Sequence, residues 1–261
     1  MRIRTIVRKE WAEVFKNKLV LMTVLVLPLV FIAVPLFQLA VTRDVDAGEL
    51  NDAPGNIAQL CTLQGLTPEE CMQIYLSKSF MVFFLLMPLA IPVTIASYSI
   101  VGEKTTHSLE PLLATPTSTA EIILGKALAA VIPAIAATWL SFAIFLVGAR
   151  FFVVSDRVYE VIANPMWLVG MLLVAPLLTV LSVSVAIVIS SRVNDPRAAE
   201  QLGTLVMLPI LGLFFLQILG LVALNLTNMF FLGVILIVVD AAMVAVGVKL
   251  FQRETILTRW R

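Results

Sequence analysis

The chain has 261 residues, of which 60% are hydrophobic and only 13% are charged, against roughly 45–50% and about 25% in soluble domains. This composition excludes an ordinary soluble domain and predicts an integral membrane protein. The net charge of +1 provides no broad basic surface, which argues against a nucleic-acid partner.

Residues 1–18 are expected to form an amphipathic helix on the inner membrane surface. Apolar side chains recur at helical spacing, and basic side chains occupy much of the remaining surface. The apolar set is Ile3, Ile6, Val7, Trp11, Val14 and Phe15. The alternative is a short soluble helix whose only role is to set the orientation of the chain.

Six apolar runs follow, each long enough to cross a bilayer core, which takes about 20 helical residues. The expected spans are residues 19–41, 80–101, 123–147, 167–190, 202–224 and 230–251. The predicted fold is therefore an all-α integral membrane protein with six transmembrane helices in a single transmembrane domain, residues 1–261. Each of the first five spans contains proline, which is typical of kinked membrane helices.

Lysine and arginine predict the orientation, because cytoplasmic loops carry an excess of both. With both termini in the cytoplasm, 14 of the 18 basic residues lie inside, and only Arg43, Lys78, Arg150 and Arg157 lie outside. We therefore expect a multi-pass protein of the plasma or inner membrane, with lipid around it and both termini cytoplasmic.

The outer loop, residues 42–79, is the only sizeable polar insert between spans. It carries both cysteines, Cys61 and Cys71, which either form a disulfide or remain free thiols. Within it, Thr67 followed by Pro68 indicates the start of a helix.

A cytoplasmic loop, residues 102–122, is predicted to hold two short helical pieces. In residues 106–113, Leu109, Leu112 and Leu113 form an apolar stripe. Pro116 interrupts the helix, and Ser118 with Glu121 forms a capping box that begins the third span. The loop therefore presents a leucine knob that is flanked by charged side chains. It is either a grip for a partner protein or an interfacial hairpin that only joins two spans.

Asp240 lies near the middle of the sixth span, where an aspartate costs about 2.5–3.5 kcal/mol on insertion scales. One interpretation is that Asp240 lines a path for a cation or polar substrate, with Gln217 as a second candidate pathway residue. The other is a helix–helix hydrogen bond to Gln217 or to a serine or threonine.

The sequence has no nucleotide-binding G-x-x-x-x-G-K-[ST] motif, no G-x-S-x-G and no H-E-x-x-H. Its single histidine, His107, and the spacing of its cysteines do not fit a zinc site. We expect no enzymatic activity, no bound metal and no cofactor held by this chain.

Three segments together resemble the permeases of ATP-binding-cassette (ABC) transporters of the type-2 exporter class. The first, in the cytoplasmic loop, consists of Glu103, Lys104, Ser108, Leu109, Glu110, Leu112, Leu113, Thr115, Pro116, Ser118, Glu121, Gly125 and Lys126. The second runs from Ser191 to Gln201, and the third from Leu250 to Leu257. The amphipathic N-terminal helix is also similar to the interfacial connecting helix of that class.

The resemblance implies a permease subunit that pairs with an identical or similar subunit and uses a separate cytoplasmic ATPase. Residues 102–122 become the coupling loop, in which Glu103, Lys104 and Glu110 meet the ATPase while the three leucines fill its cleft. ATP then acts only through the partner subunit. The fifth-to-sixth loop, residues 225–229, is too short for the re-entrant helices of larger members, which argues against lipid-linked polymer substrates.

Two other classes of function remain open at this stage. A secondary transporter or channel would use Asp240 for ion coupling, and a membrane scaffold would explain the leucine knob alone. Within the exporter class, a cation such as sodium and small hydrophobic toxins or drugs are both candidate substrates.

Overall fold

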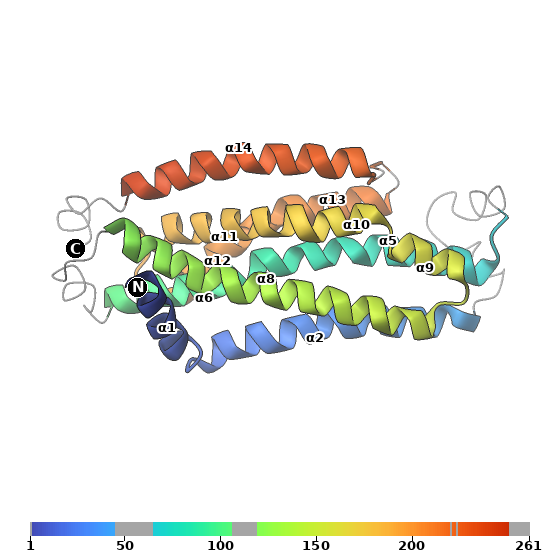
Figure 1. Ribbon diagram of the computed structural model, residues 1–261, viewed down its shortest axis with the longest axis horizontal. Helices are drawn as coiled ribbons and strands as arrows, with labels where there is room; N and C mark the ends of the chain where they lie inside the picture. Colours follow the sequence, from blue (N-terminus) through green and yellow to red (C-terminus); the bar gives the residue numbers. More distant parts are fainter. Residues whose placement is uncertain (1, 45–64, 106–118, 220, 223, 251–261) are drawn as a thin grey trace.

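The computed structural model describes residues 2–44, 65–105, 119–219, 221–222 and 224–250. This part of the chain is helical, with no β-strand, and forms an elongated bundle (Figure 1). Six helical stretches in it are long and apolar enough to cross a membrane, so the predicted all-α membrane fold is confirmed. They cover Lys18–Val41, Pro68–Thr105, Ala120–Phe152, Asp156–Ser190, Pro196–Ile218 and Leu226–Gly247.

The first helix, α1 (Arg2–Val14), lies obliquely across one end of the bundle, which we call the α1 end (Figure 1). The opposite end, where α9 (Asp156–Ile162) lies, is called the α9 end. As expected, α1 is amphipathic, but its apolar face packs against α8 (Thr119–Phe152) and α6 (Met87–Thr105). Protein therefore covers much of the face that the sequence assigned to the membrane surface.

The centre of the bundle is α6, which packs against helices on several sides. Its neighbours include α2 (Lys18–Val41), α8, α11 (Ala175–Ser190) and α12 (Pro196–Gly203). The spans that contain α2, α12 with α13 (Leu208–Ile218), and α14 (Leu226–Leu250) lie at the periphery and expose most of their apolar side chains. Burial therefore separates a core of three spans from three peripheral ones.

The second span begins earlier than its apolar run indicates. Thr67 and Glu70 form a reciprocal capping box, as the Thr67–Pro68 pattern predicts, and α5 (Pro68–Phe83) then continues through η2 (Phe84–Leu86) into α6. The expected outer loop of residues 42–79 was therefore too long, because the helix predicted to start in it continues into the second span and takes up its last 12 residues. Between Asp44 and Gly65 the chain lies outside the described residues.

The connection between the last two spans is also displaced from its expected position at residues 225–229. The fifth span ends at Ile218, because the backbone N–H groups of Leu221 and Val222 turn back to the carbonyl of Leu216. The sixth begins at Leu226. The connection is made largely of apolar residues, so hydropathy alone reads it as part of a span.

Three irregular helical turns precede prolines. η2 lies just before Pro88, the π-helical turn η3 (Gly170–Val174) before Pro176, and η4 (Thr204–Met207) before Pro209. Proline has no N–H to complete the α-helical pattern, so the preceding turn tightens or widens. α10 (Pro165–Val169) leads into η3, where the Trp139 indole N–H donates to the Met171 carbonyl at 2.8 Å.

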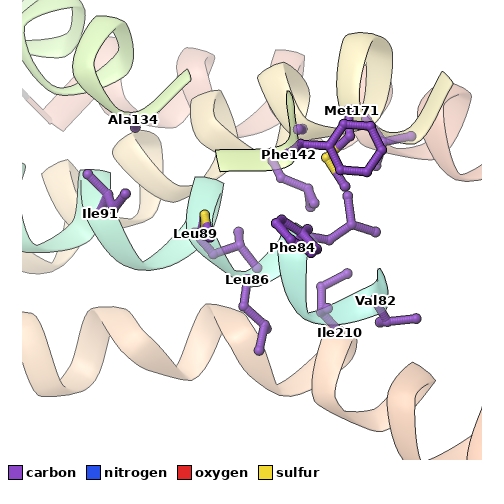
Figure 2. Packing of buried hydrophobic residues seen from close by; sticks show 14 of the residues in the cluster. Val82, Phe84, Leu86, Leu89, Ile91, Ala134, Phe142, Met171 and Ile210 are labelled. Atoms are coloured by element: carbon purple, nitrogen blue, oxygen red, sulfur yellow. The ribbon is translucent and has the colours of Figure 1, made fainter. Parts of the chain in front are cut away.

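The apolar core is densest around η2. Phe84 packs against Phe142 and Phe145 of α8, with ring centroids 5.6 and 5.1 Å apart. Figure 2 shows Phe84 near Phe142 and Met171, with Ile210 on a neighbouring helix. Phe84 is fully buried, so this cluster holds α5, α6, α8 and η3 together.

At the α9 end, one polar side chain joins three segments. Gln73 is fully buried and donates from Nε2 to the carbonyls of Leu39, at 2.8 Å, and Phe152, at 3.2 Å. Its Oε1 accepts from the Val154 N–H at 3.0 Å. Leu39 and Phe152 lie in the last turns of α2 and α8, whose carbonyls have no partner within their own helices. Gln73 therefore caps both helices from α5.

Candidate functional site

The loop that carries the predicted partner contacts is described only at its two stems. α6 ends at Thr105, and α8 begins at Thr119, the position that the capping pattern predicts. Leu109, Glu110, Leu112 and Leu113 lie outside the described residues. What the structure describes is the base of this loop, where α6 and α8 meet α1.

Glu103, the first acidic residue predicted to meet a partner, lies inside this base. It is 6% exposed. Its Oε1 lies 2.7 Å from Lys9 Nζ on α1, and its Oε2 lies 2.8 Å from Lys126 Nζ on α8. Because its carboxylate is directed at two internal cations, we revise its expected role from a surface contact to a support of the loop's base.

Lys126 is the most connected cation of this base. It is 6% exposed, and its Nζ also lies 2.8 Å from Glu10 Oε1 on α1 and 3.0 Å from Ser99 Oγ on α6. The Ser99 hydroxyl donates to the other Glu10 oxygen. Lys9, Glu103, Lys126 and Glu10 therefore form a chain of three ion pairs that begins and ends on α1, and the α1 backbone closes it into a ring. We call these four residues the ion ring.

The α1 sequence explains how Glu10 reaches this position. Val7, Glu10 and Val14 lie on one helical face, and all three are buried. The Trp11 indole N–H donates to the Ala129 carbonyl of α8 at 2.9 Å. Gly125 makes the close approach feasible, since a Cβ at this position would lie 2.6 Å from Ile6 Cγ2. An apolar face that carries Glu10 thus meets the part of α8 that carries Lys126.

The ion ring has no net formal charge, since two lysines face two glutamates. Buried ions are tolerated when they are paired and hydrogen-bonded, because desolvation of an unpaired charge costs several kcal/mol. Burial lowers the pKa of Lys9, but the hydrogen bond and charge of Glu103 outweigh it, so the pKa of Lys9 is raised above 10.5. Lys9 therefore carries its charge at neutral pH, and it extends the chain of pairs to Glu13 at 3.5 Å.

Lys104, the next residue of the predicted motif, points to a different neighbour. Its Nζ lies 3.5 Å from the Ser191 carbonyl and 3.4 Å from the Val193 carbonyl. Both carbonyls belong to the turn between α11 and α12. Lys104 therefore connects the end of α6 to the α11–α12 turn, which also lies at the α1 end.

Asp240 is 6% exposed and lies on the one face of α14 that is buried. Met229, Gly233, Leu236 and Gly247 share this face, and α14 packs against α11, α10 and η3. Neither carboxylate oxygen has a hydrogen-bond partner among the described residues. Asp240 is thus a buried acid without a partner in the part of the chain that the structure describes.

The structure does not bring Gln217 to Asp240. Gln217 lies near the end of α13 at the α9 end, and its Nε2 donates to the Lys78 carbonyl at 3.0 Å. Asp240 lies in the half of α14 nearer the α1 end. The structure therefore contradicts the alternative in which Asp240 forms a helix–helix hydrogen bond to Gln217.

Two other polar residues of interest are Cys71 and Glu200. Cys71 is buried in the first turn of α5 and is disulfide-bonded, while Cys61 lies outside the described residues. Glu200 of α12, which the sequence did not single out, accepts a hydrogen bond at 2.7 Å from Thr94, a buried threonine of α6.

Sequence reasoning missed the ion ring as a unit, although it noted Lys126 as part of a motif. One signal was present, because Glu10 interrupts the apolar face of an otherwise regular amphipathic helix. The partner, Lys126, is 116 residues away. Its pairing with Glu10 depends on how α1 crosses α8.

Comparison with known proteins identifies a family. A family model described as "ABC-2 family transporter protein" matches residues 4–234. The matched part contains the whole ion ring and both stems of the loop, and it ends before Asp240. No curated protein matches the chain.

Proposed function

The chain belongs to the ABC-2 family of transporter proteins, and from this membership we propose that it is the membrane-spanning permease subunit of an ABC exporter. It moves substrate across the membrane by means of ATP that a separate cytoplasmic subunit hydrolyses. ABC-2 permeases generally work with a cytoplasmic ATPase partner. The family match is the observation that carries this proposal.

In this proposal, the loop between α6 and α8 is the coupling loop. Leu109, Leu112 and Leu113 fill a cleft of the ATPase, and Glu110 lies beside them. The ion ring at the base of the loop supports this role, because a loop that transmits force needs a firm base. Lys104 braces the loop against the turn after α11.

The α1 end is accordingly the cytoplasmic end. The excess of lysine and arginine in segments assigned to this end supports the orientation. The α9 end, with Cys71 and its disulfide, then faces the oxidising side of the cell membrane.

A second permease subunit, identical or similar, completes the transporter. The peripheral spans support this step, because α2 and α13 expose large apolar side chains such as Leu29, Phe37, Leu208 and Phe215. Lipid covers whatever part of these faces the second subunit leaves free.

A second candidate function is a secondary transporter or channel in which Asp240 couples to an ion. The observation that favours it is the buried carboxylate without a partner among the described residues. In a membrane span, an ionisable residue of this kind commonly marks a substrate or ion path.

Co-purification from the native host tests the first proposal. The wild-type chain is purified in detergent beside Leu112→Asp and Glu110→Lys, which alter the loop, and Lys78→Glu, which alters an exposed residue near the α9 end. We expect an ATPase subunit with the wild type and with Lys78→Glu, and its loss from both loop variants. If no ATPase accompanies the wild type, the exporter proposal fails, and Asp240→Asn is then tested for transport driven by a proton or sodium gradient.

A further inference from the structure

We infer that the ion ring is a mechanical joint through which the two stems of the coupling loop move α1 and, through α1, the first span. Lys126 is the positioning residue at its centre. The effect of nucleotide in this inference rests on the proposed function, whereas the joint itself rests on the contacts alone.

The first step concerns how the ring connects the helices. Glu103 lies two residues before the end of α6, and Lys126 lies seven residues after the start of α8. On α1, Lys9 pairs with Glu103 and the next residue, Glu10, pairs with Lys126, and Glu103 and Lys126 pair with each other. A displacement of either stem therefore pulls on α1 through an ion pair.

The second step concerns slippage. Glu10, Glu103 and Lys126 are each less than a tenth exposed, so a broken pair removes a charged partner from buried ions that water does not reach. The Trp11 hydrogen bond to the Ala129 carbonyl and the close contact between Ile6 and Gly125 add a second attachment to α8. Sliding α1 along α8 is therefore costly, and concerted movement is favoured.

The third step is the connection from α1 to the first span. Only three residues separate α1 from α2, and the N–H groups of Phe15, Lys16 and Asn17 are all bonded to carbonyls of α1. The Asn17 side chain accepts from the Leu19 N–H and so caps α2. This turn is short and hydrogen-bonded throughout, so α2 follows α1 at this end.

At the other end, α2 is held by Gln73, which bonds to the Leu39 carbonyl. A displacement of α1 therefore tilts α2 about its attachment to Gln73. Because α2 exposes most of its apolar surface, this tilt meets little resistance from within the subunit. The joint thus directs loop movement to the face on which a second subunit or lipid lies.

Hydrogen exchange tests the joint, first on the permease purified alone in detergent. Lys126→Met leaves Glu10 buried without its cation and leaves Glu103 paired with Lys9 alone. The triple variant Glu10→Gln, Glu103→Gln, Lys126→Met removes the ring without stranding a buried charge, so it serves where the single variant does not fold. Lys78→Met is the matched control on the same continuous helix as Glu103. We expect α1 amides to exchange at least about tenfold faster in the ring variants, with α11 unchanged. Unaltered α1 exchange would overturn the joint.

The second arm uses the complex with its co-purified ATPase, with and without magnesium-ATP. In the wild type, nucleotide should change exchange at the end of α6, the start of α8 and α1 together. In the triple variant, the change should persist at α6 and α8 and disappear from α1. If α1 of the variant still responds as in the wild type, transmission through the ring is refuted. If α1, α6 and α8 all lose their response, the ring acts in partner binding instead of transmission. An ATPase that never co-purifies contradicts the proposed function, while the first arm still decides the joint.

Discussion

Replacement of Gln73 by methionine should destabilise the α9 end of the bundle more than any single hydrogen bond accounts for. The side chain is fully buried and makes three hydrogen bonds to backbone groups of Leu39, Phe152 and Val154. Methionine has a similar length but offers only a weak acceptor sulfur, so it preserves the volume and removes the bonds.

The expected magnitude follows from the three groups that lose their partner. A buried backbone group without a partner costs about 1–3 kcal/mol. The Leu39 carbonyl retains a long contact with the Thr42 hydroxyl, and new apolar contacts of methionine offset part of the loss. The net destabilisation should therefore be about 3–5 kcal/mol, which lowers the melting temperature by roughly 6–20 °C for a chain of this size.

Thermal unfolding in detergent, at one scan rate because unfolding can be irreversible, measures this difference. Gln217→Met is the matched control, since Gln217 makes one such bond, to the Lys78 carbonyl. The control should cost about 0.5–1.5 kcal/mol. Equal melting shifts for the two variants would show that Gln73 does not cap α2 and α8.

Three further changes test other parts of the structure. Gly125→Ala places a Cβ 2.6 Å from Ile6 Cγ2, so it should lower the free energy of unfolding in detergent by about 1–3 kcal/mol. A second substitution, Ile6→Ala, should restore stability. If it does not, the close contact of α1 with α8 is contradicted. Asp240→Leu removes a buried acid that has no partner among the described residues and should stabilise the protein by about 1–3 kcal/mol; a loss of stability would reveal a partner. The raised pKa of Lys9 adds stability below its ordinary value of 10.5, and this is lost as pH rises through the raised pKa. Melting temperatures should therefore fall less steeply above about pH 10.5 in Lys9→Met than in the wild type; identical profiles would remove Lys9 from the ring.

The spans were predictable because apolar runs of this length have few other structures available to them. The span boundaries were less predictable where polar residues lie inside a helix or apolar residues lie outside one. Gln73, Ser77 and Ser79 made residues 68–79 read as an outer loop, but all three side chains are buried in a helix. Conversely, the apolar residues after Ile218 led to a predicted fifth span that was too long. In the structure, the N–H groups of Leu221 and Val222 bond to the Leu216 carbonyl and end the helix.

The two helix ends that flank the candidate coupling loop were predictable from the sequence, but the contacts between them were not. Local pattern was enough to place a helix break and a new helix start on either side of the loop. It could not show that Glu103 faces inward, because a residue at the end of a span can face water or a neighbouring helix equally well. Glu103 faces inward because it forms ion pairs with Lys126 and Lys9, and these belong to helices that pack beside α6 only in the folded bundle.

The two ends of the bundle are held by different chemistry, and this difference bears on how it can move. In a membrane, apolar helix surfaces gain little by leaving lipid, so polar contacts have a large share in fixing how helices align. At the α9 end, Gln73 joins α2, α5 and α8 through neutral hydrogen bonds. At the α1 end, charged groups join α1, which leads into the first span, to α6 of the second span and α8 of the third. Charged pairs bind strongly to each other, yet they also respond to any new charge brought near them. In the proposed complex, charged side chains of an ATPase beside the loop stems would act on the end of the bundle whose contacts respond to charge, while the neutral end would supply the fixed point.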